Sequence, residues 1–315
     1  MFKFQKDQSS FAIGVMMFGG QPGKRPPVLV GSIFYPDHSI VIDRKEGRVD
    51  TERLSDAVSA AESLAERLHM GHALAVFMDA PSGVHGLLSA AADCSNGALF
   101  LDSSSQKTKR RALEEAESAG ISDRVVYNSL HIGSPEDEWS SLRDHGVDSA
   151  VISAFDPGDI TVKGRIHLLD NGGSLSSMGL VDKAALYGIK KPLLDLAATS
   201  YEQRGGAALR AIMLAKAKWG LPSGCSLHNT VETWPPVTQN ADGFARHVDS
   251  SSVAITVMSG ADWLMYGPLG FEKVSILCCL RLLHDGTVRI RTMVTQRRIL
   301  SIISLRSLFL KGLER

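Results

Sequence analysis

Short apolar runs and longer amphipathic segments alternate along most of the chain. Residues 28–34 form an apolar, β-branched run that predicts a strand, and residues 50–70 carry apolar side chains at helical spacing, with Thr51 as the candidate cap. The predicted strands are residues 28–34, 73–78, 98–101, 125–127, 150–155, 193–196, 225–227 and 263–266. The predicted helices are residues 50–70, 86–92, 106–119, 135–144, 180–187, 207–219 and 248–258.

This alternation of strands and helices has the length expected for one closed (β/α)8 TIM barrel. An open doubly wound sheet is the alternative that the same alternation allows. Two short apolar stretches near the start, followed by a Gly-Gly-Gln-Pro-Gly turn at residues 19–23, predict an N-terminal hairpin laid across one end of the barrel. The chain therefore divides into a hairpin at residues 1–26, a barrel at residues 27–286 and an atypical basic tail at residues 287–315.

Composition narrows the function classes. With 315 residues and a formal charge of zero, the chain lacks the basic field typical of nucleic-acid-binding proteins, so no nucleic-acid partner is expected. Residues 281–315 depart from this balance, with eight basic and two acidic residues. The four cysteines show no CxxC spacing, which argues against a structural zinc site and for a reducing compartment. Because no signal-peptide pattern and no membrane-spanning run is found, we expect a cytoplasmic protein.

Polar residues follow the apolar part of several predicted strands. Because the carboxyl ends of barrel strands meet at one mouth, such residues are candidates for a binding site. Asp79 and Asp156 stand close to prolines, and a turn or helix cap explains them as well as a site does. The stronger candidates directly follow buried runs and need polar partners. They are Asp102, Asn128, Asp195 and Asn229.

Short motifs, taken in order, point to a known family. They are Phe-Lys-Phe at 2–4, Gly-Gly-Gln-Pro-Gly at 19–23, Val-Gly-Ser-Ile-Phe-Tyr at 30–35, Phe-Leu-Asp-Ser at 100–103, Val-Tyr-Asn-Ser at 126–129, Gly-Cys at 224–225, His-Asn at 228–229 and Tyr-Gly-Pro at 266–268. With these motifs the chain resembles the H subunit of tetrahydromethanopterin S-methyltransferase. It equally resembles stand-alone relatives that move methyl groups between tetrahydrofolate and corrinoid proteins. The resemblance covers about residues 1–275.

The resemblance implies a pterin-binding barrel, usually a homodimer, that works with a corrinoid protein and could be a peripheral subunit of a larger methyltransferase complex. The implied methyl carrier is tetrahydrofolate or tetrahydromethanopterin, and the corrinoid is supplied by the partner. By motif, Asp102, Asn128 and Asp195 correspond to pterin-holding positions, and Asn229 to the asparagine near the methyl-bearing N5. Asp156 is a further candidate for pterin binding, and no residue is expected to hold a metal.

Chemistry explains why these residue types suit a pterin. A carboxylate accepts both protons of the ring N–H and exocyclic amino group in a bidentate pair. Nitrogen N5 is a poor leaving group, and Asn229 can supply or relay a hydrogen bond as the C–N bond breaks. His228 adjoins Asn229, but strand alternation turns it to the opposite side, which favours a core or supporting histidine.

Departures from the family pattern leave other functions open. Ser226-Leu227-His228 replaces the usual Gly-Pro-His, and residues 199–206 are unusually polar. After about Val274 the sequence looks like a shifted reading frame, or else like a divergent helix pair that covers the barrel or a dimer contact. A catalytically silent barrel that binds pterin or a corrinoid protein is one alternative. A condensing enzyme like dihydropteroate synthase is another, although no clear set of basic residues for its pyrophosphate leaving group is found.

Overall fold

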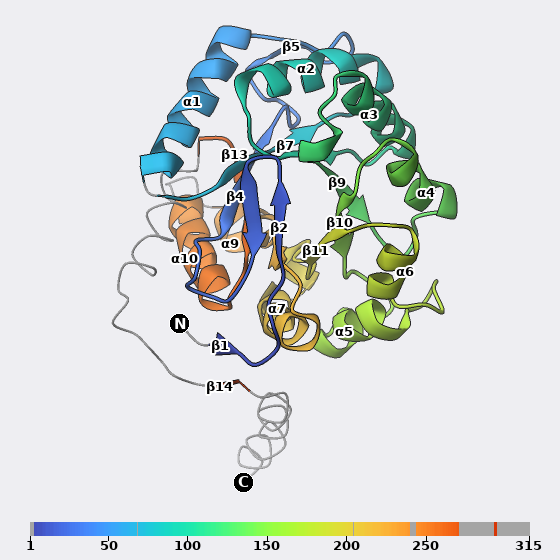
Figure 1. Ribbon diagram of the computed structural model, residues 1–315. Helices are drawn as coiled ribbons and strands as arrows, with labels where there is room; N and C mark the ends of the chain where they lie inside the picture. Colours follow the sequence, from blue (N-terminus) through green and yellow to red (C-terminus); the bar gives the residue numbers. More distant parts are fainter. Residues whose placement is uncertain (1–2, 68, 204, 240–243, 271–292, 295–315) are drawn as a thin grey trace.

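Eight parallel strands close into a barrel with helices packed around it (Figure 1). The computed structural model describes residues 3–67, 69–203, 205–239, 244–270 and 293–294. Round the barrel the strand order is β4, β7, β8, β9, β10, β11, β12 and β13, after which β13 pairs with β4. Their bounds are Val28–Ile33, His72–Phe77, Leu99–Asp102, Val125–Leu130, Ser149–Ser153, Lys191–Asp195, Ser223–Cys225 and Trp263–Pro268. The predicted TIM barrel is confirmed, and the open sheet is excluded.

Helices connect successive strands and bury the barrel's outer surface. They are α1 (Thr51–Arg67), α2 (Val84–Cys94), α3 (Gln106–Ser118), α4 (Glu136–Asp144), α5 (Val162–Asn171), α6 (Leu180–Leu186), α7 (Gly205–Trp219), α8 (Leu227–Glu232), α9 (Pro235–Thr238) and α10 (Phe244–Met258). Apolar residues of these helices and outward-facing residues of the strands form the largest core cluster. No helix in the described ranges is long and apolar enough to cross a bilayer.

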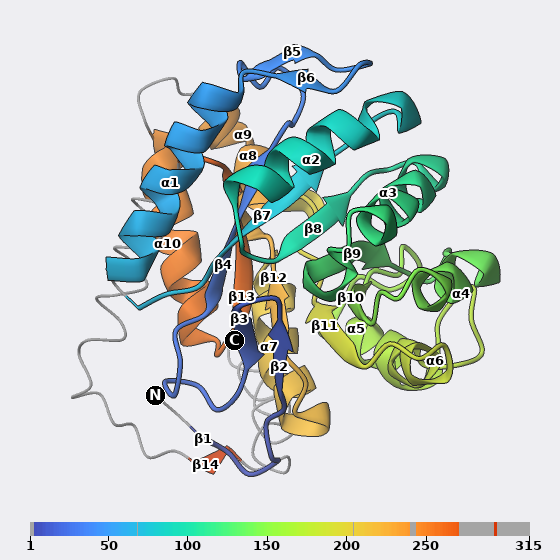
Figure 2. The same cartoon turned by 45° about the horizontal axis from the view of Figure 1, so that its top comes forward.

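The predicted N-terminal hairpin is present and closes one end of the barrel. Strands β2 (Ser10–Ile13) and β3 (Met16–Gly19) pair antiparallel, and the hairpin lies beside β4 (Figure 2). The side chains of Ile13 and Phe18 are fully buried among the inward-facing residues of the barrel. The Gly14 N–H donates to the carbonyl of Asp123, which lies just before β9. The hairpin therefore covers the amino ends of the strands and leaves the carboxyl ends open.

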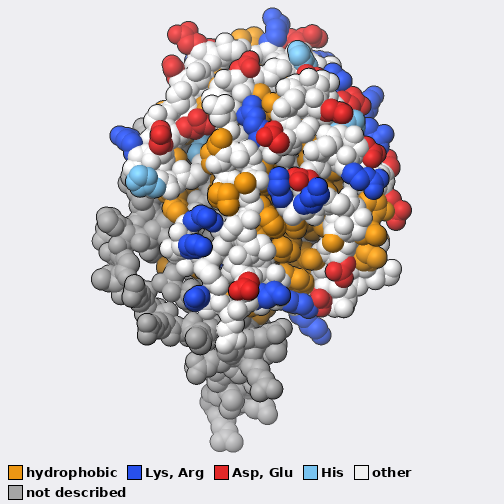
Figure 3. Space-filling model, in the orientation of Figure 1, with side chains coloured by type: hydrophobic (Ala, Val, Ile, Leu, Met, Phe, Trp, Pro, Cys, Tyr) orange, Lys and Arg blue, Asp and Glu red, His pale blue; other side chains and the backbone are white. Residues whose placement is uncertain are grey.

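Smaller elements complete the chain. Strand β1 (Lys3–Phe4) pairs with β14 (Met293–Val294), and β5 (Val41–Asp43) pairs with β6 (Arg48–Val49). Three 3-10 turns are η1 (Pro81–Gly83), η2 (Ser122–Arg124) and η3 (Tyr201–Gln203). The basic tail predicted at residues 287–315 lies outside the described residues apart from β14. On the face shown in Figure 3, acidic and basic side chains are interspersed.

Some predicted elements differ from the structure. Helix α5 was missed, because its sequence lies in a connection that resembles a Gly- and Ser-rich loop. Helix α1 is capped by Asp50, whose Oδ1 accepts from the Arg53 N–H at 3.1 Å, and Thr51 is instead its first residue. Strand β12 ends at Cys225 instead of Leu227.

The early end of β12 has a local cause. Leu227 and Val231 are both buried and lie four residues apart, so the segment that follows Ser226 buries its apolar side chains as a helix. Within β12, a Cβ atom on Gly224 would stand 2.2 Å from the Trp263 carbonyl oxygen of the next strand. Glycine is therefore required where β12 approaches β13.

Candidate functional site

Four polar side chains form a layer inside the barrel at the open end. Val126, Val151 and Leu193 point inward among the interior apolar residues. Because side chains alternate along a strand, the residues two positions further along point inward as well. Asp102 likewise follows inward-facing Phe100 by two positions. The layer therefore comprises Asp102 on β8, Asn128 on β9, Ser153 on β10 and Asp195 on β11.

Asp102 and Asn128 form one half of this layer. They are register partners on adjacent strands, and the Asn128 amide donates a hydrogen bond to the Asp102 carboxylate. Burial raises the pKa of Asp102 to about 6, against the charge of Lys109 and the Asn128 hydrogen bond, which both lower it. Both side chains are partly exposed, so a ligand in the mouth can reach them. The pair offers a carboxylate and an amide side by side.

Asp195 and Ser153 form the other half. They are also register partners, with Ser153 Oγ 3.5 Å from Asp195 Oδ2, and Asp195 Oδ1 accepts from the Ala197 N–H at 2.9 Å. Burial raises the pKa of Asp195 to about 6, while the Ala197 hydrogen bond and the charge of Arg165 lower it. Asp195 is partly exposed at the mouth. The layer thus holds two carboxyls that titrate near pH 6, on strands three positions apart round the barrel.

Arg165 supports Asp195 from behind. Its side chain on α5 is buried, with the whole residue 1% exposed. Its guanidinium donates to the carbonyls of Leu196 and Ala197 at 2.8 and 3.0 Å, and to those of Gln203 and Ile160. The cation therefore fixes the backbone that leaves β11, beside Asp195. Burial lowers the pKa of Arg165, and the charge of Asp195 offsets part of this effect.

Asn229 does not lie at the end of a strand, where its sequence context predicted it. It lies on the short helix α8 that follows β12, with an exposed side chain whose Oδ1 accepts from Ser226 Oγ at 3.2 Å. Because α8 follows the carboxyl end of β12, Asn229 stays on the open side of the barrel. Its amide nitrogen has no hydrogen-bond partner among the described residues, which leaves a donor for a ligand.

His228 takes the supporting place that was expected, although through a helix and not through strand alternation. Its Nδ1 lies 3.1 Å from Asp249 Oδ1 on α10, and its ring packs where a Cβ atom on Gly267 would clash. Burial works to lower the pKa of His228, but the hydrogen bond and charge of Asp249 outweigh it and leave the pKa raised. The histidine therefore anchors α8 to α10.

Asp156 and Asp79 have other partners. The Asp156 carboxylate accepts from the Ser174 N–H, the Ser174 hydroxyl and the Gly158 N–H, each at 2.8 Å, and the residue is 5% exposed. Burial acts to raise its pKa, but these hydrogen bonds lower it overall. Asp79 lies 3.4 Å from Arg44 at the surface. Asp156 thus ties down the loop after β10, the turn role that the sequence also allowed.

Sequence reasoning missed three polar side chains around the layer. Ser153 could have been found from strand parity, because it follows inward-facing Val151 by two positions. Lys109 and Arg165 gave no signal, because a cation on a helix normally indicates a solvated face. Within the described ranges, no three His, Cys, Asp or Glu side chains are placed to hold a metal ion.

Comparisons with known proteins place this geometry in a family. The family model described as tetrahydromethanopterin S-methyltransferase MtrH subunit matches residues 6–279. The chain is 31% identical to the H subunit of tetrahydromethanopterin S-methyltransferase from Methanothermobacter marburgensis over 282 residues, covering 89% of this chain and 91% of that protein. It is 31% identical to the H subunit of the putative methyltransferase mtx from Methanosarcina barkeri over 274 residues, covering 86% and 88%.

Solved structures of low identity share the fold. Dihydropteroate synthase from Vibrio fischeri matches with a TM-score of 0.60 at 11% identity, over 90% of this chain and 100% of that one. The Xanthomonas albilineans dihydropteroate synthase in complex with 7,8-dihydropteroate matches with a TM-score of 0.57 at 12% identity, over 89% and 98%. These identities show the barrel fold alone. From the family model and the relatives, the chain belongs to the tetrahydromethanopterin S-methyltransferase MtrH subunit family.

Proposed function

We propose that the protein moves a methyl group between N5 of a tetrahydropterin, either tetrahydrofolate or tetrahydromethanopterin, and the cobalt of a corrinoid protein. The observation that carries the proposal is the inward layer of Asp102, Asn128 and Asp195 at the open end of the barrel. Membership of the MtrH subunit family supports it, because the curated relatives are named as methyltransferase subunits.

The layer matches the edge chemistry of a reduced pterin. The pterin presents a ring N–H beside an exocyclic amino group, and a carboxylate accepts both protons at once. Asp195, with Oδ1 and Oδ2 held by Ala197 and Ser153, is oriented to do so. Asn128 both donates and accepts, so it suits a ring carbonyl next to a ring N–H. Both aspartates are mostly ionised at neutral pH, because their pKa values are about 6.

Methyl transfer itself needs little from the protein besides positioning and one proton. The reduced cobalt of the partner supplies the electron pair for the new Co–C bond, and N5 keeps the pair of the broken C–N bond and takes up a proton. Asn229 is the residue assigned to stabilise N5 during this change, through its amide hydrogen-bond donor. It lies on the short helix α8, just beyond the end of β12, with an exposed side chain.

A condensing reaction of the dihydropteroate synthase type is a poorer fit to the site. Such chemistry needs cations facing a pyrophosphate leaving group. Lys109 and Arg165, whose charges act on the two aspartates, are both buried behind the barrel wall. Lys109 pairs with Glu138, and Arg165 donates to backbone carbonyls. Neither is directed at the mouth.

The proposal includes the setting of the reaction. A separate corrinoid protein supplies the cobalt, and the protein works as a cytoplasmic homodimer that could associate with a larger methyltransferase complex. Light scattering of the purified protein measures the oligomeric state. Copurification with a corrinoid protein, read from its visible absorption, measures the partner.

The test begins with calorimetric titration of the protein with methyl-tetrahydrofolate and, separately, methyl-tetrahydromethanopterin. The absorption spectrum then follows conversion of cob(I)alamin into methylcobalamin, with free cobalamin and with a corrinoid protein. Asp102→Asn and Asp195→Asn should each weaken pterin binding at least tenfold. Asp79→Asn is the matched control, because that aspartate lies two residues beyond β7 and pairs with Arg44 at the surface. Binding without any transfer would indicate the silent scaffold, and absence of binding would overturn the proposal.

A further inference from the structure

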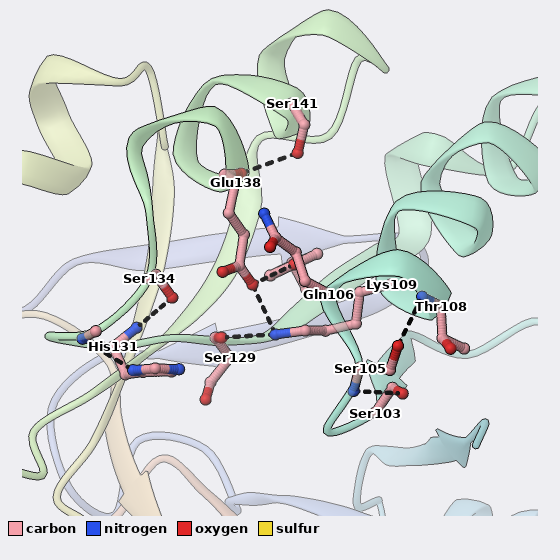
Figure 4. A network of polar contacts seen from close by, with 12 residues as sticks. Ser103, Ser105, Gln106, Thr108, Lys109, Ser129, His131, Ser134, Glu138 and Ser141 are labelled. Atoms are coloured by element: carbon pink, nitrogen blue, oxygen red, sulfur yellow. Dashed lines mark hydrogen bonds and ion pairs between the residues drawn. The ribbon is translucent and has the colours of Figure 1, made fainter. Parts of the chain in front are cut away.

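A buried ion pair lies directly behind Asp102 and Asn128, on the outer side of the barrel wall. Lys109 of α3 places its Nζ 2.8 Å from Glu138 Oε1 of α4, and the two side chains are 7% and 5% exposed. The hydroxyl of Tyr127 on β9 donates to the same Glu138 oxygen at 2.5 Å. Figure 4 shows Lys109 extended between Glu138 and Ser129.

Stability alone gives little reason for this arrangement. A buried ion pair loses the hydration of both charges, and well-packed apolar residues of similar volume often stabilise a fold as well or better. The ammonium group of Lys109 is also fully engaged, since it donates to the Ser129 carbonyl at 3.2 Å and lies 4.6 Å from the centre of the Tyr127 ring. Each of these contacts fixes the position of one positive charge.

Two features connect that charge to the inward layer. Ser129 directly follows Asn128, so the Lys109 hydrogen bond fixes the backbone that aims the Asn128 amide. The positive charge of Lys109 also acts on Asp102, the register partner of Asn128. The Lys109 cation thus acts on both members of the pair: on Asn128 through the backbone and on Asp102 through its electric field.

We propose that Lys109 is a positioning residue of the pterin site, which holds the Asn128–Ser129 backbone in place and presents a positive charge to Asp102, and that Glu138 and Tyr127 fix the position of that charge. This inference rests on the proposed function for its role in pterin binding. The electrostatic part concerns Asp102 itself and is measured without any ligand.

Other charged groups lie around this cluster, on helices α3 and α4 and just after β9. The charges of Arg110 on α3 and Asp137 on α4 also act on Tyr127, and these two residues pair with each other at 2.8 Å on the surface. The charges of Glu138 and Lys109 act on His131, which follows β9, and burial lowers the pKa of His131. Because His131 is a titratable group in contact with the charges of this cluster, His131→Gln is made in every background to remove its contribution.

The test compares variants for which we expect opposite shifts in the pKa of Asp102. Lys109→Met removes the cation and should raise the pKa of Asp102 by about one unit or more. Glu138→Gln removes the neutralising anion, keeps an acceptor for Tyr127, and should lower that pKa. Lys109→Arg keeps the charge and should restore the wild-type value. Lys216→Met is the matched control, because Lys216 forms a similarly buried pair with Asp262 at 2.5 Å beside the N-terminal segment.

Two readouts follow the pKa. Carboxyl carbon NMR of aspartate-labelled protein, assigned with Asp102→Asn, measures it in the free protein. Calorimetric titration with the methyl-pterin from pH 5.5 to 8.5 measures its effect on binding. For Lys109→Met, the loss of affinity should approach tenfold below pH 6, and the pH-dependent part should vanish by pH 8.5. A further variant, Lys109→Met with Glu138→Gln, leaves no unpaired buried charge if the single variant fails to fold.

Opposite shifts for Lys109→Met and Glu138→Gln, with Lys216→Met unchanged, would support the inference. An unmoved Asp102 pKa in all of these variants would overturn it, even where binding falls uniformly, because a merely structural role predicts only that uniform loss. A wild-type protein that binds no methyl-pterin would overturn the proposed function and the binding role together. A wild-type protein that binds, combined with an unmoved pKa, overturns the inference alone.

Discussion

Replacing Asp195 by asparagine should stabilise the free protein while it weakens pterin binding. The variant keeps the shape of the side chain and an oxygen for the Ala197 N–H, and Ser153 can accept from the new amide. What it removes is a negative charge from a position where burial raises the pKa of Asp195 from 3.8 to about 6. Asparagine therefore imitates the protonated form, which is favoured more strongly in the folded protein than in the unfolded chain.

The size and pH window of the effect follow from that pKa. A group whose pKa is raised in the folded state binds its proton more tightly there, so stability is highest at low pH and declines as the pH rises. For Asp195 the decline runs from about pH 3.8 to about pH 6 and is complete above it. A rise of about two units corresponds to about 3 kcal/mol at neutral pH, and relaxation reduces this to about 1–3 kcal/mol.

Urea denaturation at pH 8 and again near pH 4 measures the difference. At pH 8, Asp195→Asn should be more stable than the wild type by about 1–3 kcal/mol, and near pH 4 the gain should nearly disappear. Binding should change in the opposite direction, with about 2–4 kcal/mol lost when the buried carboxylate partner of the pterin is removed. Asp56→Asn, an exposed aspartate on α1, is the control for loss of a charge and should change neither quantity.

A less stable Asp195→Asn at pH 8 would refute this reasoning. It would mean that the attraction between Asp195 and the buried Arg165 exceeds the loss of hydration, so that the carboxylate supports the fold. A gain of equal size at both pH values would place the cause in packing and not in ionisation. Retained pterin affinity in the variant would separate Asp195 from the site.

Three further predictions concern the mouth, the wall and the closed end of the barrel. Asn229→Ala should slow methyl transfer roughly 10- to 1000-fold in single-turnover measurements, with pterin affinity changed much less, and equal losses in both would reverse the division of roles. Gly224→Ala should lower the free energy of unfolding by at least about 1–3 kcal/mol, because the new Cβ atom meets the Trp263 carbonyl at 2.2 Å. Lys216→Met should cost about 3 kcal/mol in the same assay by leaving Asp262 buried without its cation, whereas an unchanged midpoint would show that water replaces that cation.

The sequence was sufficient to predict the barrel because its strands and helices carry different hydrophobic periods. The eight runs between Val28 and Tyr266 were located to within a few residues, and their closure follows from the number of units. Helix α5 escaped because its neighbourhood is rich in glycine and serine, and its boundaries depend on Thr161, whose hydroxyl accepts from the Gly164 N–H. Such a cap is visible in the sequence only once the helix is suspected.

For the candidate site, the alternation of side chains along each strand decides which strand-end residues face the mouth. Asp195 follows inward-facing Leu193 by two positions, and Asp102 follows Phe100 in the same way. Asp156 also follows an apolar run, but β10 ends at Ser153, so Asp156 lies beyond the strand and binds its own loop. The composition of these segments is similar, and only the position of the strand end separates them.

The supporting cations could not be predicted because their partners are far away in sequence. Lys109 meets Glu138 of the next helix, and Arg165 meets carbonyls that follow β11. Both come from helices whose other charged residues, apart from Glu115, are at least partly exposed. Each cation faces one inward aspartate from behind, so the two carboxyls keep pKa values near 6 when burial alone would raise them further. The outer helices therefore set the ionisation of the inner layer, and a variant of either cation tests whether ligand binding at the mouth depends on charges that no ligand can touch.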